Sequence, residues 1–198
     1  MSQSKILSGQ GKNSWFNVIK RICDFGNITF DNIGAVNLEK IFRDIFKVNW
    51  KKERDNSLTE GKLGLLAQCK SDFNRSPYLF SKIFPSYKRA LAKFRVSAHQ
   101  LPIEADRYLN IPRSARVCLL GCDAIGNEQH YLMDCKHPGV KEINSSLLSK
   151  IGLLKNDFKV MSGEEKTVFI LSRSNEELLW VTGKLCHKVL SRFNEMTR

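Results

Sequence analysis

The sequence predicts a mostly α-helical, bundle-like domain with one central loop closed by cysteine and histidine side chains. Apolar residues recur at helical spacing along most of the chain, and strand-like segments are few. Three of the six cysteines and one of the four histidines crowd into a single short loop. The 198 residues suffice for one domain with a sizeable core or for two small ones.

The first part of the chain predicts helices separated by polar breaks. Residues 1–13 are polar and predict a frayed terminus. A short helix is expected from Trp15 to Cys23, with a turn or short strand near residues 28–30. Asn37 can cap a clear second helix, and the polar run 51–57 after it predicts a linker or a solvated helix end. The apolar residues of this helix are Leu38, Ile41, Phe42, Ile45 and Phe46.

Proline residues separate the next three expected elements. Thr59 opens a helical element that ends near Asn74, and Ser76-Pro77 breaks it. Ser86 is expected to cap a helix whose apolar stripe continues to Ala98. A short helical turn between Pro102 and Pro112 then leads into the cysteine-rich loop.

Three helices are expected after the loop. One covers Lys141 to Gly152, and the last covers about Glu176 to Phe193. Between them, Ser162 and Glu165 have the spacing of a capping box, in which each residue bonds the other's backbone N–H.

The loop residues Cys118, Cys122, His130 and Cys135 predict a tetrahedral zinc site. Thiolate and imidazole are preferred zinc ligands, and Gly121 allows the tight turn that the first thiol pair requires. Four protein ligands favour a structural site over a catalytic one, which keeps a position open for water.

Some points of this interpretation stay open. Structural zinc sites usually separate paired thiols by two residues, whereas three residues separate this pair. His137 is close enough to replace His130 or Cys135, and a chance cluster without metal is the alternative. The remaining cysteines, Cys23, Cys69 and Cys186, lie far apart and are expected to fill the core.

The zinc loop completes the expected organisation of the chain. In order, we expect a flexible N-terminus (1–13), an N-terminal helical segment (14–57), a basic helical region (58–117), a zinc-binding loop (118–138) and C-terminal helices (139–198).

The charge of the chain predicts a polyanionic partner. The formal net charge is +12, and residues 82–116 alone carry eight Lys and Arg against two acidic residues. So large an excess of one sign favours binding to RNA or DNA through the phosphate backbone. The aromatic residues of this segment, Tyr87, Phe94 and Tyr108, can either stack on bases or belong to the core. We favour the core for these residues. The expected phosphate contacts are Lys88, Arg89, Lys93, Arg95, Arg113 and Arg116.

Other function classes lack their sequence signatures. The chain has no paired aspartates, no glycine-rich phosphate loop, no Gly-x-Ser-x-Gly and no His-Glu-x-x-His, so we expect no complete active site. Residues 1–15 show no signal peptide, and no apolar run approaches the ~20 residues of a membrane span. We therefore expect an intracellular protein, nuclear or cytoplasmic and not secreted, without a membrane partner.

An ordered series of short motifs covers about residues 60–140 and resembles one known family. Together these motifs resemble the region after the polymerase in non-LTR retrotransposon reverse transcriptases of animal genomes. The segments are Lys62-Leu63, Ser71-Asp72-Phe73, Pro77-Tyr78-Leu79, residues 89–95, residues 103–108, residues 112–118, and Glu128-Gln129-His130-Tyr131-Leu132 with Cys135.

The resemblance implies zinc ligands at Cys118, Cys122, His130 and Cys135, and a role in holding element RNA or target DNA. This chain departs from the family pattern at the first thiol pair, and the family's acidic stretch is reduced to Glu128. No polymerase or endonuclease accompanies the tail. We therefore expect a noncatalytic, zinc-stabilised nucleic-acid-binding module. The alternatives are a protein-interaction scaffold and a metal-dependent nuclease, which needs an open metal position.

Overall fold

The computed structural model describes residues 20, 23–24, 38–59 and 63–197, which fall into two compact units. The first unit is Met1–Asp55 and the second is Asn56–Arg198. The predicted frayed terminus, and the turn or strand near residues 28–30, lie outside the described residues, as does most of the helix expected from Trp15 to Cys23. Cys23 itself is buried.

The long helix α3, Leu38–Thr59, provides most of the described part of the first unit. It includes the mostly exposed polar run 51–57, so the alternative of a solvated helix end is confirmed and that of a linker is wrong. Glu39 pairs with Arg43 one turn later at 3.0 Å, which is the favourable order of charges along a helix.

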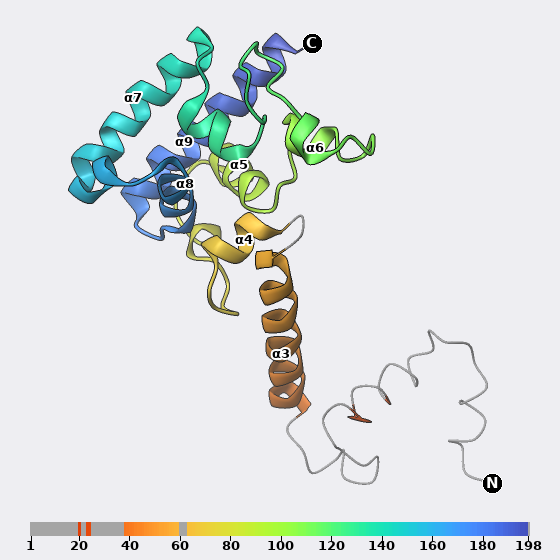
Figure 1. The fold of residues 1–198 in the computed structure, drawn as a ribbon. Coiled ribbons are helices and arrows are strands. Elements are labelled where there is room, and N and C mark those ends of the chain that lie inside the picture. Colours follow the sequence, from red (N-terminus) through yellow and green to blue (C-terminus); the bar gives the residue numbers. More distant parts are fainter. Residues whose placement is uncertain (1–19, 21–22, 25–37, 60–62, 198) are drawn as a thin grey trace, which may run out of the picture. The chain divides into compact units, whose positions relative to one another are not determined.

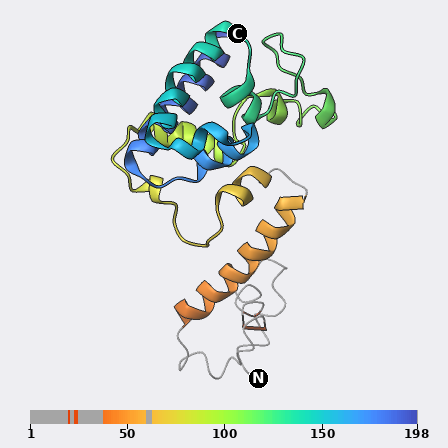
Figure 2. The same cartoon turned by 60° about the vertical axis from the view of Figure 1, so that its left-hand side comes forward.

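The second unit is built from helices, as Figures 1 and 2 show. Within residues 56–59 and 63–197 no strand forms, and one isolated antiparallel bridge joins Val117 to Ile125. The prediction of a mostly helical fold is therefore confirmed. The α-helices are α4 (Gly64–Cys69), α5 (Pro85–Arg95), α6 (Pro102–Ala105), α7 (Pro138–Leu154), α8 (Gly163–Ser172) and α9 (Glu176–Met196). The short turns are η2 (Pro77–Leu79), η3 (Arg113–Ala115), η4 (His130–Asp134) and η5 (Asn156–Val160).

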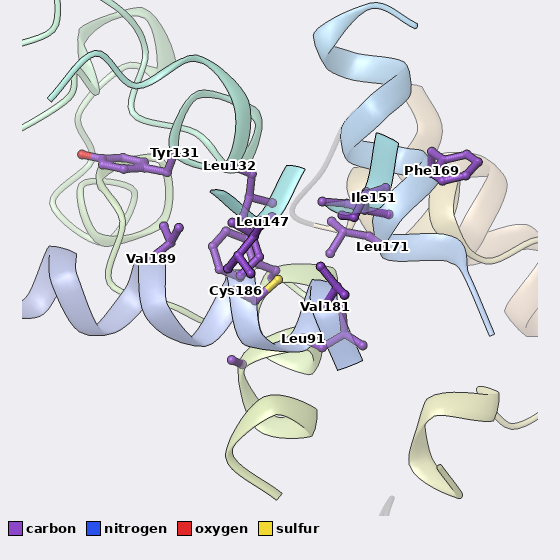
Figure 3. Packing of buried hydrophobic residues seen from close by; sticks show 14 of the residues in the cluster. Leu91, Tyr131, Leu132, Leu147, Ile151, Phe169, Leu171, Val181, Cys186 and Val189 are labelled. Carbon is purple, nitrogen blue, oxygen red and sulfur yellow. The ribbon is translucent and has the colours of Figure 1, made fainter. Parts of the chain in front are cut away.

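Helix α9 is the centre of this unit and packs against both α5 and α7. Its inward residues contribute to one continuous core, in which Cys186 and Val189 are fully buried. Figure 3 shows these side chains gathered with Leu91 of α5, Leu147 of α7 and Leu132 of η4. Because η4 carries one of the predicted metal ligands, the core fixes part of the candidate site. Each such buried aliphatic side chain stabilises the fold by ~1.5–3 kcal/mol.

Several helix ends differ from the sequence prediction. Helix α5 begins at Pro85, because proline is well suited to the first turn of a helix, and Ser86 is not its cap. Helix α7 likewise begins at Pro138 rather than at Lys141 and continues to Leu154. The capping box between Ser162 and Glu165 is confirmed, with both reciprocal hydrogen bonds present.

Cys69 and Cys186 are buried in the core, as predicted. No helix in the described part of the chain is long and apolar enough to span a membrane.

Candidate metal centre

The side chains of Cys118, Cys122, His130 and Cys135 come together in the second unit. One ligand atom from each residue lies within 4.8 Å of the ligand atoms of the other three. The thiols of Cys122 and Cys135 are 3.9 Å apart, and all six cysteines of the chain are free. Thiolates that share one tetrahedral ion at about 2.3 Å lie about 3.8 Å from each other. The sequence-predicted ligands therefore have the spacing of a metal site.

The first arm of the site is a tight loop from Cys118 to Cys122. Its base is closed by a backbone hydrogen bond of 2.9 Å from Cys118 N to Ala124 O. Gly121 adopts a φ of +83°, in the left-handed region that glycine occupies without strain. Leu120 N donates to Cys118 Sγ at 3.4 Å, which stabilises negative charge on this sulfur. The additional residue between the two thiols is accommodated in this turn.

The second arm carries His130 at the start of η4, which is a single π-helical turn, and Cys135 directly after it. Cys135 N donates to His130 O at 2.7 Å, a bond that spans five residues and closes the wide turn. In a regular α-helix, side chains five residues apart point in clearly different directions. The wider turn brings them together. Asn127 Oδ1 fixes the start of the arm by accepting from His130 N at 2.8 Å.

The electrostatics of the cluster favour a bound cation. Cys118, His130 and Cys135 are buried and Cys122 is half-buried. Burial raises the pKa of the Cys135 thiol to about 12, whereas the pKa of Cys122 is lowered. Burial opposes this lowering of the Cys122 pKa, but hydrogen bonds from the backbone of Lys136 and from the neighbouring thiols outweigh it. Buried thiols of this kind require a nearby positive charge to ionise together.

The imidazole of His130 meets the requirements of a metal ligand. Burial lowers its pKa, and the carboxylate of Asp134 offsets this only in part. The ring is therefore neutral near pH 7 and has a lone pair to donate. Its Nε2 atom is buried and has no hydrogen-bond partner among the residues that the structure describes. A buried nitrogen without a partner is costly, so the donor set fits a metal ion on the evidence of the side chains themselves.

His137 does not belong to the cluster. Its Nδ1 accepts a 3.2 Å hydrogen bond from Gly139 N, so the side chain caps α7. Of the two candidate histidines, the structure brings His130 to the three thiols.

A second polar cluster, which sequence reasoning missed, lies beside the metal centre. The carboxylate of Glu128 is buried and receives Ser97 Oγ at 2.6 Å and His99 Nε2 at 3.1 Å on one oxygen. Burial raises the pKa of Glu128. The hydrogen bonds from His99 and Ser97, together with the charge of His99, outweigh burial, so the pKa lies below its usual value. Because Ser97 and His99 both bond the carboxylate, this is not a nucleophile–base pair. The sequence motif around Glu128 draws attention to this carboxylate, but it does not identify Ser97 and His99 as partners, because both lie some thirty residues away in the chain.

The predicted phosphate contacts divide into an exposed and an enclosed group. Arg89, Lys93 and Arg113 are exposed. Lys88 is half-buried, and its Nζ donates to Leu79 O at 3.2 Å. These four residues remain the candidates for contact with a polyanion.

The other two predicted contacts, Arg95 and Arg116, have partners within the protein. Arg95 is only 4% exposed and lies over the ring of Tyr78, 4.9 Å from its centroid, so it is not part of the exposed cationic surface. Arg116 is half-buried and donates to the carbonyls of Ile103 and Ile111, each at 2.8 Å. Its main task in this fold is to hold the segment between α6 and the metal loop.

Comparisons with protein-family models, with curated proteins and with solved structures find no match for this chain. The class that fold and site define is a helical domain with a cluster of three cysteines and one histidine that can hold a metal ion.

Proposed function

We propose that this protein is a noncatalytic, zinc-stabilised module that binds RNA or DNA through the phosphate backbone. The observation that most supports this proposal is that a basic segment and the candidate metal site follow one another directly in the chain. A cation-rich stretch, residues 82–116, leads directly into the Cys118–Cys135 cluster. A loop held in one conformation by a metal ion, next to a basic segment, is a suitable arrangement for binding a polyanion.

The donor set favours zinc over other metals. Three thiolates and one imidazole in tetrahedral reach are a common structural zinc set. Cys118, Cys122, His130 and Cys135 would together fill the coordination sphere, which leaves no position for a reacting water and favours a structural role. When bound, the ion supplies a cross-link between the two arms. Such sites contribute ~10–16 kcal/mol of apparent binding free energy at neutral pH.

The distribution of charge in the basic stretch supports a nucleic-acid partner. Glu104 is 4% exposed and is paired with Arg107 through hydrogen bonds of 2.7 and 3.1 Å. Lys82, Arg89, Lys93 and Arg113, by contrast, are exposed. The glutamate of this stretch is therefore buried, whereas four of its eight cations are exposed and available to a polyanion. A phosphate backbone would also relieve the repulsion between Arg89 and Lys93, one turn apart on α5.

The family resemblance supports the same proposal. The motifs between residues 60 and 140 are similar to the post-polymerase region of non-LTR retrotransposon reverse transcriptases. On this reasoning the chain shares the nucleic-acid-binding role of that region.

Metal analysis of the purified protein tests the zinc part of the proposal. We expect one zinc ion per chain, and its loss in Cys122→Ser. The matched control is Cys69→Ala, which removes a buried thiol outside the cluster and should retain the zinc. A wild-type protein without zinc after expression in zinc-supplemented medium contradicts this part.

Salt-dependent binding tests the nucleic-acid part. The Arg89→Gln/Lys93→Gln variant should bind labelled RNA or DNA more weakly and with a flatter salt dependence. Each lost phosphate contact lowers the slope of log K against log salt by ~0.7–0.9. The control is Lys150→Gln/Lys155→Gln, which removes the same charge from exposed positions in and after α7. Absence of any complex at about 50 mM salt, or a complex insensitive to salt, contradicts the proposal.

A further inference from the structure

A cluster of aromatic rings lies between α5 and α9, outside the metal centre. The ring of Tyr87 is its hub and makes edge-on contacts with Phe84 at 5.3 Å and with Trp180 at 6.2 Å between centroids. The imidazole of His187 lies 5.6 Å from the same ring. The close approach of the two helices at Gly183 brings them together, because a Cβ there would lie 2.8 Å from Tyr87 Cβ.

This aromatic cluster opens to solvent on the side of Phe84. Phe84 is 59% exposed, and Tyr87, Trp180 and His187 are half-buried. Phe80 in the preceding turn is also exposed, at 67%, and the hydrogen bond from Lys88 Nζ to Leu79 O ties this turn to α5. Exposed aromatic side chains that adjoin a half-buried aromatic cluster are typical of a binding surface rather than of isolated surface residues.

Cations accompany these rings. Lys184 Nζ lies over the ring of Trp180, 4.7 Å from its centroid, and Lys188 follows one turn later on α9 and is exposed. Lys82, two residues before Phe84 in the sequence, is also exposed. The acidic neighbour Glu176 accepts a 3.0 Å hydrogen bond from the backbone N–H of Lys82. The surface therefore combines accessible π-faces with side chains that can pair with phosphates.

We propose that this aromatic surface binds unpaired bases of single-stranded RNA or DNA by stacking. The inference rests on the proposed nucleic-acid function and specifies its ligand. Rings flanked by lysines recognise single strands, because every unpaired base offers a π-face while its phosphate remains free to meet a cation. In a duplex the bases are stacked on one another, so the rings of Phe80 and Phe84 have no face to contact.

The test compares Phe80→Ala/Phe84→Ala with the full-length wild type. Both side chains are largely exposed, so their truncation leaves the core intact. The matched control is Leu153→Ala/Val160→Ala, which truncates side chains 79% and 87% exposed elsewhere on the second unit. Fluorescence anisotropy with labelled oligothymidylate, oligouridylate and a duplex of equal length measures the dissociation constants. We expect affinity for the single strands to fall about tenfold or more, with duplex affinity changed by less than about twofold.

Three results overturn the inference and differ in what they leave standing. Unchanged single-strand affinity in Phe80→Ala/Phe84→Ala, with salt-dependent binding intact, refutes stacking but leaves the proposed function in place. Wild-type protein that binds neither strand form refutes both. Sedimentation velocity that finds a wild-type dimer and a monomeric variant assigns the surface to a protein contact instead.

Discussion

Ser97 Oγ donates a 2.6 Å hydrogen bond to Glu128 Oε1, and this bond joins the segment directly after α5 to the arm that carries His130. Ser97 follows α5 with a φ of +49°, so the chain turns sharply there and directs the hydroxyl inward. His99 Nε2 reaches the same carboxylate oxygen. These hydrogen bonds therefore hold the end of α5 against the second arm of the candidate metal centre, independently of any ion.

Replacement of Glu128 by alanine should destabilise the protein measurably. Ser97 Oγ and His99 Nε2 would both lose their buried acceptor, and such an unsatisfied group costs ~1–3 kcal/mol. Urea denaturation of the zinc-loaded protein measures the free energy of unfolding. Glu142→Ala, at an exposed position on α7, should change it by less than ~0.5 kcal/mol. Equal unfolding free energies for the two variants would show that the Glu128 contacts carry no net stability.

The approach of α5 to α9 predicts opposite effects of alanine at two helical glycines. At Gly183 a Cβ would meet Tyr87 Cβ at 2.8 Å, and neither atom can move without its backbone. Overpacking of this kind costs ~1–3 kcal/mol and exceeds the gain of up to ~1 kcal/mol in helix propensity. At Gly152 in α7 the nearest contact is 3.6 Å from the flexible side chain of Lys159, so Gly152→Ala should stabilise.

Thermal unfolding of both glycine variants measures these shifts. We expect a lower midpoint for Gly183→Ala and a higher one for Gly152→Ala. If both variants raise the midpoint, propensity dominates and the two helices are not in the close contact described.

Features encoded by neighbouring residues were predicted well from the sequence. The four candidate metal ligands lie within eighteen residues, and their residue types single them out without knowledge of the surrounding fold. The capping box of α8 follows in the same way from the spacing of Ser162 and Glu165, and the start of α9 at Glu176 agrees with the sequence prediction. The π-turn at His130 did not follow, because no residue type encodes it and the closure of the two arms imposes it.

Features that depend on distant residues were missed. Ser97 and Glu128 meet across a separation of 31 residues, and Tyr87 meets Trp180 across a still longer one. Arg95 was expected at the surface because it is charged, but it follows the fully buried Phe94 and enters the core edge against Tyr78. Periodicity gives the inward face of a helix with an error of about one residue position, which is enough to misplace a residue at the margin of the stripe.

The capping box of α8 predicts a shifted titration. Hydrogen bonds from the backbone and hydroxyl of Ser162 lower the pKa of Glu165 below its usual 4.5. A lowered folded-state pKa means that the stabilisation is present above the unfolded value and is lost as the pH falls through the folded one. NMR titration of the Glu165 carboxyl should give a midpoint below 4.5. Ser162→Ala should raise this midpoint only part of the way to the usual value, because alanine keeps the backbone N–H that donates to Glu165. An unshifted midpoint in the wild type contradicts this prediction.

The choice between His130 and His137 as metal ligand can be decided by zinc affinity. His130 Nε2 is buried without a partner in the described part of the chain, and its ring lies with three thiols, whereas His137 caps α7. Competition with a chromophoric chelator should find zinc affinity reduced at least ~10-fold in His130→Ala. His137→Ala should keep near-wild-type affinity and lose only a helix cap, a stability cost of ~0.5–2 kcal/mol. Since protons compete with zinc for thiolate and imidazole, wild-type affinity should also fall as the pH is lowered. Greater loss of affinity in His137→Ala would mean that His137 and not His130 completes the site.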